Sequence, residues 1–471
     1  MLTIVGGEVG AAASERHSKR TAHDDHEGEP DGNEIVRAFL ILAWIRSRES
    51  KLLLCLMLGI TFGPESVCSK GLPSYNHGYI TEATGRMRWR VRLRHRLRVA
   101  TLNLDSMVTN LFSWMARRAA LPWLLTAHLL WGHCLLGQTS QPPKPIEVKV
   151  VVIAAFERGE DTGDAPGEFQ LWVEREHLDR VFELPAGYHH VRMNNDGVLG
   201  MVTGVATAKA AASVMALGLD PRFDVSKAYW IVAGIGGGDP ADVSLGSAVW
   251  ADHVIDGDLA FEIDARQIPE SWSTGFVPLR KGVPYEQPLR NDLEGEVYTL
   301  NAQLVGWAFG LTRNLALADS DALRKSRARF VGFPNALRPP FVARGDTMSA
   351  STFWHGSKME EWANAWTKYY TGGTGNYMVA AMEDSGTLQA LTFLSRAGRV
   401  DLERVLVLRT VSNYDREAPG TTAAESLKSM IFGNYSAYLP ALEAAQIVGD
   451  RVVRDIVEHW GERVARIPQV Q

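Results

Sequence analysis

The sequence has only three cysteines, and all of them lie near its beginning. Cys55, Cys68 and Cys134 precede residue 140, so residues 141–471 contain none. That long remainder cannot form a disulfide, use a thiolate nucleophile or bind a metal through cysteine. It also lacks an apolar run long enough to form a membrane-spanning helix. Any activity of residues 141–471 must therefore rest on other side chains, and no membrane span is expected there.

Basic residues are also in slight deficit. The chain has 49 Lys and Arg against 54 Asp and Glu, which gives a net charge of −5. The first 140 residues hold 17 of the basic and 12 of the acidic residues, so the acidic excess belongs to the rest of the chain. An acidic surface repels a phosphate backbone, and we expect no nucleic acid partner.

The first 114 residues show no steady hydrophobic period. Between Arg86 and Arg98, arginine occupies every second position, which in a strand would align seven guanidinium groups on one face. One interpretation is a contact with nucleic acid or anionic lipid. The other is that residues 1–114 are an artefactual or disordered extension, produced by assigning the start too early. We favour the second because of the segment that follows.

Residues 115–140 have the layout of a secretory signal peptide. Met115 is followed by Arg117 and Arg118, a long apolar run and a polar exit. Translation from Met115 would give an exported protein, periplasmic or secreted, whose mature part is one domain over residues 141–471. The alternative is that residues 119–137 form a buried hydrophobic helix.

From residue 148 onward, strand-like and helix-like segments alternate. Continuous β-branched or apolar runs predict strands at 148–156, 198–204, 245–256, 341–349, 376–384 and 404–412, and a strand that runs into a glycine turn at 228–240. Helix-forming periodicity predicts helices at 207–219, 299–312 and 385–398. This alternation indicates an α/β domain with a mainly buried sheet, in which ligands bind beyond the carboxyl ends of strands.

A glycine-rich segment follows one predicted strand. AGIGGGDP (233–240) is predicted to be a turn whose backbone N–H groups can approach a ligand, or else a plain tight turn. It is not a dinucleotide-binding fingerprint, because Pro240 follows and no helix does.

Polar side chains follow three other predicted strands. Glu383, beside Met382, is a candidate to accept two hydroxyl hydrogen bonds, or it favours the start of the next helix. Asn413 suits a purine edge and Asp415 suits acid catalysis, or either caps a turn. In FERGED (156–161), Glu157 is a candidate to activate water and Arg158 to hold phosphate, unless this is a solvated loop.

Taken in order, these segments resemble a known family. VTGVATAKAAAS, WIVAGIGGG, ARGDTMS, VAAMED and VLRTVSNYD follow the succession seen in purine nucleoside phosphorylases and nucleosidases. With AAFERGED, LAFEIDARQIP, STGFVPL and PGTTAAESL, the chain more closely resembles the purine nucleoside permease family over residues 147–460.

The resemblance implies a three-layer α/β/α sandwich with a central mixed sheet and a site for a purine nucleoside. By position, Glu383 would hold the ribose 2′- and 3′-hydroxyls, with Met382 against the sugar. Asn413 would take the place of the acid that protonates the purine N7. The other positions implied are Gly234, Gly236 and Gly237 facing the base, phosphate or water, and Thr203 and Gly204 in the pocket wall.

Two departures from the family pattern bear on activity. Asn413 cannot deliver a proton, but it can bond N7 and a 6-oxo group, which favours inosine or guanosine. Asp415 is the alternative acid, although we expect the strand to turn it to the opposite face. The second departure is in FERGED, which offers only Glu157 and Arg158 and is followed by a glycine-rich segment.

The predicted function is therefore an exported purine nucleoside-binding protein that cleaves the N-glycosidic bond with phosphate or water. The alternative is a non-catalytic component of nucleoside uptake. No cofactor or metal is expected, phosphate is a candidate co-substrate, and a homo-oligomer is compatible with the resemblance.

Overall fold

The computed structural model describes residues 143–289, 294–432 and 437–470. The arginine-rich strip at 86–98 and the predicted signal peptide at 115–140 lie outside these ranges. The extension, the signal peptide and the export they imply therefore remain predictions.

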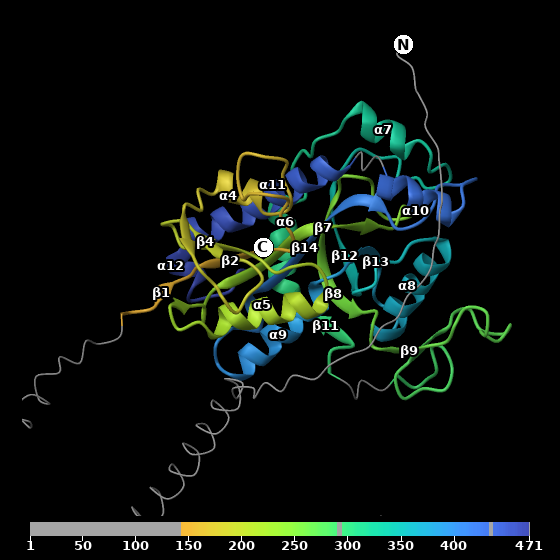
Figure 1. Cartoon of the computed structure of the whole chain (residues 1–471), viewed down its shortest axis with the longest axis horizontal. Coiled ribbons are helices and arrows are strands. Elements are labelled where there is room, and N and C mark those ends of the chain that lie inside the picture. Colours follow the sequence, from red (N-terminus) through yellow and green to blue (C-terminus); the bar gives the residue numbers. More distant parts are fainter. Residues whose placement is uncertain (1–142, 290–293, 433–436, 471) are drawn as a thin grey trace, which may run out of the picture. The chain divides into compact units, whose positions relative to one another are not determined.

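The described chain alternates strands and helices, as the sequence predicts (Figure 1). The strands are β1 Ile146–Glu147, β2 Val150–Ala154, β3 Arg180–Phe182, β4 Val191–Met193, β5 Val198–Val202, β6 Phe223–Asp224, β7 Tyr229–Gly238, β8 Ala248–Asp256, β9 Ala260–Glu262, β10 Phe276–Pro278, β11 Val297–Thr299, β12 Val342–Ser349, β13 Tyr377–Ala381 and β14 Val405–Tyr414. The helices are α4 Gln170–Arg175, α5 Thr207–Leu219, α6 Ala302–Thr312, α7 Asp321–Arg327, α8 Ser357–Tyr370, α9 Asp384–Arg396, α10 Ala423–Phe432, α11 Tyr438–Glu458 and α12 Trp460–Arg463, with a 3₁₀ turn at Leu402–Arg404.

One ten-stranded mixed sheet forms the centre of the fold, and the prediction of a mixed central sheet is confirmed. Its main path runs β11-β8-β12-β13-β7-β2-β5-β4-β3, and β14 pairs with both β7 and β8. β2 pairs in parallel with β5 on one side and β7 on the other. All five β2 side chains are buried, which is why its sequence is an unbroken apolar run.

Five of these strands close into a ring, which the sequence did not predict. β7 pairs with β14, β14 with β8, β8 with β12, β12 with β13, and β13 with β7 again. The sheet is therefore not an open middle layer over its whole width, because this part is a small closed barrel.

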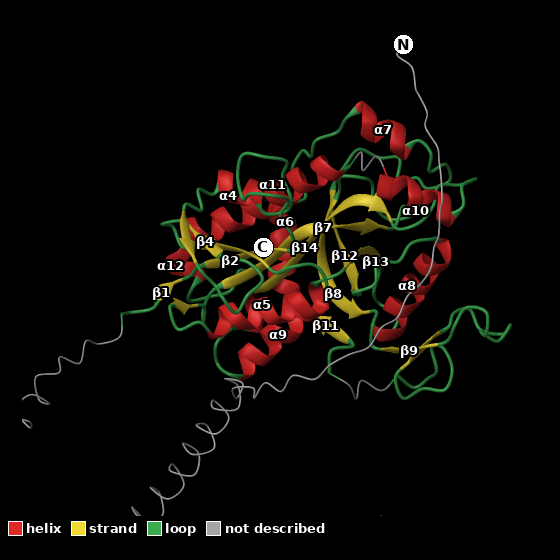
Figure 2. Ribbon diagram, in the orientation of Figure 1, coloured by secondary structure: helices red, strands yellow, loops and turns green. Residues whose placement is uncertain are grey.

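Helices lie on both sides of the sheet (Figure 2). α5 packs against α9 on one side, and α11 packs on β7 and β14 on the other. The long α11 buries a helical stripe of apolar residues, including Leu442, Val448, Val452 and Ile456. Among the described residues, no helix combines the length and hydrophobicity needed to cross a membrane.

The glycine-rich segment is strand, so the prediction of a turn at 233–240 is wrong. Gly234, Gly236, Gly237 and Gly238 all lie in β7, which pairs with β14 from Trp230 to Gly238. Close neighbours explain why glycine stands at these positions: a Cβ on Gly236 would lie 2.5 Å from the Ala380 carbonyl oxygen. The glycines therefore serve close packing within a paired strand.

Candidate functional site

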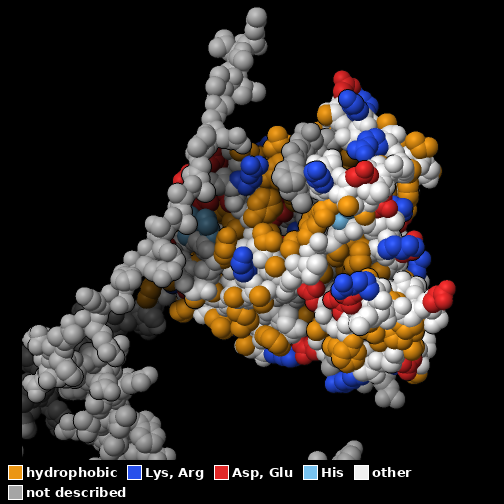
Figure 3. Space-filling view, turned by 45° about the vertical axis from the view of Figure 1, so that its right-hand side comes forward, with side chains coloured by type: hydrophobic (Ala, Val, Ile, Leu, Met, Phe, Trp, Pro, Cys, Tyr) orange, Lys and Arg blue, Asp and Glu red, His pale blue; other side chains and the backbone are white. Residues whose placement is uncertain are grey.

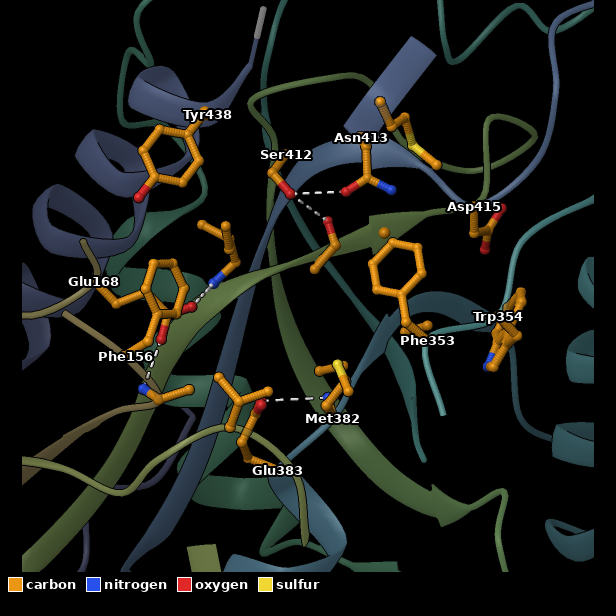
Figure 4. Close-up of a pocket in the computed structure, with 18 of the residues that line it drawn as sticks. Phe156, Glu168, Phe353, Trp354, Met382, Glu383, Ser412, Asn413, Asp415 and Tyr438 are labelled. Carbon is orange, nitrogen blue, oxygen red and sulfur yellow. Dashed lines mark hydrogen bonds between the residues drawn. The ribbon is translucent and has the colours of Figure 1, made fainter. Parts of the chain in front are cut away.

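A cavity of about 730 Å³ opens where strand ends meet loops. Its walls come from the segment after β2, the glycines of β7, the ends of β13 and β14, the loop after β12, and the start of α11 (Figure 4). The face shown in Figure 3 is hollowed and carries hydrophobic side chains with basic ones among them. The cavity thus lies at the carboxyl ends of strands, where the sequence placed the candidate residues.

Seven of the predicted residues line this cavity. They are Arg158, Gly236, Gly237, Met382, Glu383, Asn413 and Asp415. They come from segments up to 257 residues apart in the sequence, and the strand pairing of β7 with β13 and β14 brings most of them together.

Glu383 lies two residues after the end of β13 and is 5% exposed. Its Oε1 accepts a hydrogen bond from the Ala206 backbone N–H at 3.2 Å, and its Oε2 accepts one from Met382 N–H at 3.3 Å. Burial raises the pKa of Glu383, and the nearby Arg409 charge opposes that rise. A carboxylate has about four acceptor positions, so Glu383 can still accept hydroxyl groups.

A buried arginine holds this carboxylate in place. Arg409 on β14 is 1% exposed, and its Nη2 lies 3.1 Å from Glu383 Oε2 and also bonds Asp384. Burial lowers the pKa of Arg409, but the Asp384 and Glu383 charges outweigh this effect and raise it. Gly234 makes room for this network, because a Cβ there would lie 2.5 Å from Arg409 Nη1.

The sequence analysis missed one carboxylate of the cavity, Glu168. Its two oxygens accept hydrogen bonds of 2.6 Å from the backbone N–H groups of Ala155 and Ile235, which fixes it between β2 and β7. Burial raises its pKa to about 7, although the Arg409 charge opposes the shift. Glu168 is therefore a carboxylate that exchanges protons near neutral pH. The available sequence signal was its place at the end of a Gly- and Pro-rich loop.

Glu157, which the sequence predicts to activate water, instead bonds backbone N–H groups at the start of α4. Its Oε2 accepts hydrogen bonds from the backbone N–H groups of Phe169 and Gln170 at 2.9 and 2.6 Å, and its Oε1 bonds Gly167. It therefore stabilises the start of α4 and is not among the residues that line the cavity. Glu168, from the same loop, lines the cavity, where Glu157 was expected.

Three further predicted residues lie behind the cavity wall. Thr203 is buried, and its hydroxyl bonds the carbonyl oxygens of Ala154 and Gly204. Gly204 has a φ of +83° beside the side chain of Tyr188. Neither of them, nor Gly234, lines the cavity, whose wall here is formed by the next residue, Val205.

At the other end of the cavity, Ser412 orients Asn413. The Ser412 hydroxyl lies 2.9 Å from Asn413 Oδ1, and Asn413 Nδ2 donates to the Tyr414 carbonyl oxygen at 3.1 Å. An amide nitrogen carries two hydrogens, so one remains for a ligand. The contact with Ser412 thus presents Asn413 to the cavity as a donor.

Asp415 also lines the cavity, so the expectation that the strand turns it away is wrong. Side chains two residues apart share a face of a strand, and Asp415 follows the end of β14. Tyr377 donates its hydroxyl hydrogen to Asp415 Oδ2. Burial and the charge of Asp239 raise the pKa of Asp415 to about 7, while the bond from Tyr377 lowers it.

The rest of the lining is mostly apolar and aromatic. Phe353 and Trp354 come from the loop after β12, Phe156 follows β2, and Tyr438 begins α11. The Arg158 guanidinium lies 5.6 Å from the centre of the Tyr438 ring. A cavity with aromatic walls and a few polar groups at its ends suits a flat, polar-edged ligand.

One group of metal-ligating residues occurs in the described ranges, away from the cavity lining. The ligand atoms of Asp161, His189 and His190 lie within 4.8 Å of one another. Arg192 Nε is 2.5 Å from the same Asp161 carboxylate. A guanidinium so close disfavours a cation, and the cluster instead fixes the loop between β2 and α4 to β4.

Comparison with known proteins assigns the family. Residues 147–467 match the family model described as purine nucleoside permease (NUP). The chain belongs to the purine nucleoside permease family. The resemblance predicted from its segments is thereby confirmed.

Relatives from two yeasts carry the same name. A probable purine nucleoside permease of Schizosaccharomyces pombe is 30% identical over 269 residues, which are 55% of this chain and 76% of that protein. A purine nucleoside permease of Candida albicans is 27% identical over 270 residues, which are 56% of this chain and 65% of that protein. The aligned part of the chain thus spans less than two thirds of the Candida relative.

Solved structures with some likeness include two enzymes. A 5′-methylthioadenosine/S-adenosylhomocysteine nucleosidase from Neisseria meningitidis has a TM-score of 0.39 and 17% identity, over 65% of this chain and 99% of that one. The futalosine hydrolase of Helicobacter pylori strain 26695 has a TM-score of 0.40 and 14% identity, over 65% and 98%. Scores this low carry no argument for function.

Proposed function

We propose that this permease-family protein binds a purine nucleoside in the cavity and cleaves its N-glycosidic bond, with water or phosphate accepting the ribose. One observation carries the proposal: a single cavity has a buried carboxylate at one end, Glu383, and a proton-bearing acid with an amide, Asp415 and Asn413, at the other (Figure 4). This arrangement matches a ligand with a diol at one end and a nitrogen heterocycle at the other.

In this proposal the ribose end is bound first. Glu383 accepts the 2′- and 3′-hydroxyl hydrogens, and Met382 packs against the sugar. Arg409 opposes the rise in the pKa of Glu383 that burial causes and so favours its ionised form, because removing a charge from water without a partner is costly. Positive charge that develops on the ribose is then stabilised by Glu383.

Glu168 takes the role that the sequence analysis gave to Glu157. As the oxygen of a water molecule bonds to C1′, one of its protons passes to the Glu168 carboxylate. If phosphate attacks instead, no proton need be removed, and Arg158 is the cation on the cavity wall that would hold it. The products are then free purine with ribose or with ribose 1-phosphate.

The purine end completes the reaction. When the bond between C1′ and N9 breaks, its electron pair moves into the purine ring. Asn413 Nδ2 donates a hydrogen bond to N7, and Asp415 supplies the proton that neutralises the leaving base. The one free Nδ2 hydrogen can be shared between N7 and a 6-oxo oxygen, which are both acceptors, and this favours 6-oxopurines such as inosine and guanosine.

The alternative is a nucleoside-binding component of uptake without catalysis. It is favoured by Asn413, since an amide held by Ser412 cannot transfer a proton. In that case Glu383 and Asn413 would bind the two ends of the nucleoside, and Asp415 would remain unused.

The test is to incubate the purified protein with inosine, guanosine and adenosine, each with and without phosphate, and to measure free base by chromatography. Release only with phosphate identifies a phosphorylase, and release without it identifies a nucleosidase. Saturable binding without release supports the uptake function. If the protein neither binds any of the three nucleosides nor releases free base, the proposal is refuted.

A further inference from the structure

A second, smaller pocket adjoins the purine end of the main cavity. It has a volume of about 90 Å³ and shares Ser412, Asn413 and Met430 with the main cavity. A water molecule needs about 10–15 Å³, so this pocket has room for a group of several heavy atoms. It lies on the side of Asn413, whereas Glu383 lies at the opposite end of the main cavity (Figure 4).

The lining of the second pocket is positively charged. Two arginines, Arg329 and Arg416, contribute to it, and none of its lining residues in the described ranges is acidic. Ser426 and Ser429, one helical turn apart on α10, add hydroxyl groups. Guanidinium and hydroxyl donors that line one pocket favour an anion.

Neither arginine is fully neutralised within the described part of the chain. Arg329 has no carboxylate within 4.0 Å there, and its Nη2 reaches Thr421 Oγ1 only at 3.5 Å. Arg416 Nη1 lies 2.6 Å from Glu360 Oε2, but its buried Nε has no hydrogen-bond partner among the described residues. Burial, with Asp239 and Asp415 nearby, raises the pKa of Glu360, which weakens its ability to neutralise Arg416.

We infer that this pocket binds an oxyanion next to the purine base, held by Arg329, Arg416 and the serines of α10. The inference rests on the proposed nucleoside function. It adds an anionic group to the ligand, or beside it, beyond the edge of the base. The oxyanion is a carboxylate carried on the 6-position of the purine, or a free phosphate bound beside it. It is not the attacking phosphate, because the ribose lies at the other end of the cavity.

The test compares three nucleosides by calorimetry on the full chain: inosine, N6-succinyladenosine, and N6-butyladenosine as a neutral control of similar bulk. We expect the succinyl compound to bind about tenfold or more tightly than the butyl compound. Arg329→Gln should remove that preference and leave inosine affinity unchanged. Arg451→Gln, on the exposed face of α11, is the matched control and should change neither.

A second titration distinguishes the source of the anion. Inorganic phosphate that binds to the inosine complex, and fails to do so in Arg329→Gln, identifies a free oxyanion. If inosine binds but neither the succinyl preference nor phosphate binding depends on Arg329, the inference is overturned. If inosine does not bind, the proposed function fails, and phosphate added to the protein alone still decides about the pocket.

Discussion

The guanidinium of Arg409 lies 3.1 Å from the carboxylate of Glu383, and both side chains are almost completely shielded from water. Arg409 comes from the middle of β14, four residues before Asn413, and Glu383 follows β13. The ion pair therefore links the strand that carries Asn413 to the residue that we propose binds the ribose. It also opposes the rise in the pKa of Glu383 that burial causes, and so favours the charged form that the proposed role requires.

Replacing Glu383 tests that role. We expect Glu383→Gln to weaken inosine binding about 10- to 100-fold, because two hydroxyl groups lose a charged acceptor. Calorimetry with inosine and 2′-deoxyinosine measures this, since the normal protein should prefer the ribose and the variant should not. Glu458→Gln, exposed on α11, is the control. A preference for ribose that survives in Glu383→Gln would assign the hydroxyls to another group.

Tyr377 is expected to set the pH dependence of base release. Its hydroxyl lowers the pKa of Asp415, so Tyr377→Phe should raise that pKa above about 7. Asp415 then stays protonated to higher pH, and the alkaline limb of the rate profile moves to higher pH. Tyr298→Phe, whose hydroxyl bonds Gln389 away from the cavity, should leave the profile unchanged. An unmoved alkaline limb in Tyr377→Phe would exclude Asp415 as the acid.

Glu168 is expected to make stability depend on pH. Its pKa is raised from 4.5 to about 7 on folding, so the folded state holds an extra proton between these values. Its stabilising effect is complete below pH 4.5 and is lost as the pH rises through 7, by about 3 kcal/mol.

Urea unfolding at pH 5 and pH 8 measures this effect. The free energy of unfolding should fall less between the two pH values in Glu168→Gln than in the normal protein. The amide leaves one backbone N–H without its acceptor, but that penalty is the same at both pH values. Equal pH dependence in the two proteins would contradict the raised pKa.

Two glycines give a matched test of packing in β7. A Cβ on Gly236 would lie 2.5 Å from the Ala380 carbonyl oxygen and 2.6 Å from Val379 Cγ1, so Gly236→Ala should destabilise the fold by about 1–3 kcal/mol. Gly310 lies in α6 with nothing within 4 Å, so Gly310→Ala should stabilise it by about 0.5–1 kcal/mol. Thermal unfolding compares them, and equal effects would refute the packing argument.

Local pattern sufficed to predict the seven described strands of five or more residues and three of the helices, but not the long α11. The helix predicted at 207–219 coincides with α5, and the strand predicted at 341–349 differs from β12 by one residue. Each has a composition that favours one state whatever its neighbours. The glycines of 234–238 were misassigned because their conformation is decided by β13 and β14, which are far away in the sequence.

The site residues at the ends of strands were predictable from the sequence, whereas the residue that a folded loop brings into the cavity was not. Asn413 lies near the end of β14, Asp415 directly follows that strand, and Glu383 lies two residues after β13, so the ends of the predicted strands located them. Glu168 reaches the cavity only because its loop folds back and because Ala155 and Ile235 offer N–H groups to it. Glu157 and Glu168 are both glutamates in one loop. Only tertiary contacts distinguish Glu168, which is buried and lines the cavity, from Glu157, which bonds the start of α4.

The five-strand ring of β7, β14, β8, β12 and β13 has a consequence for selectivity. Asn413 on β14 and Ala380 on β13, three residues before Glu383, both pair with Gly237 of β7, so these two strands cannot move apart without breaking strand pairs. The span between the two ends of the ligand is thus a fixed length. A site of this kind rejects a molecule whose sugar and base are too close or too far apart, even when both groups are chemically correct.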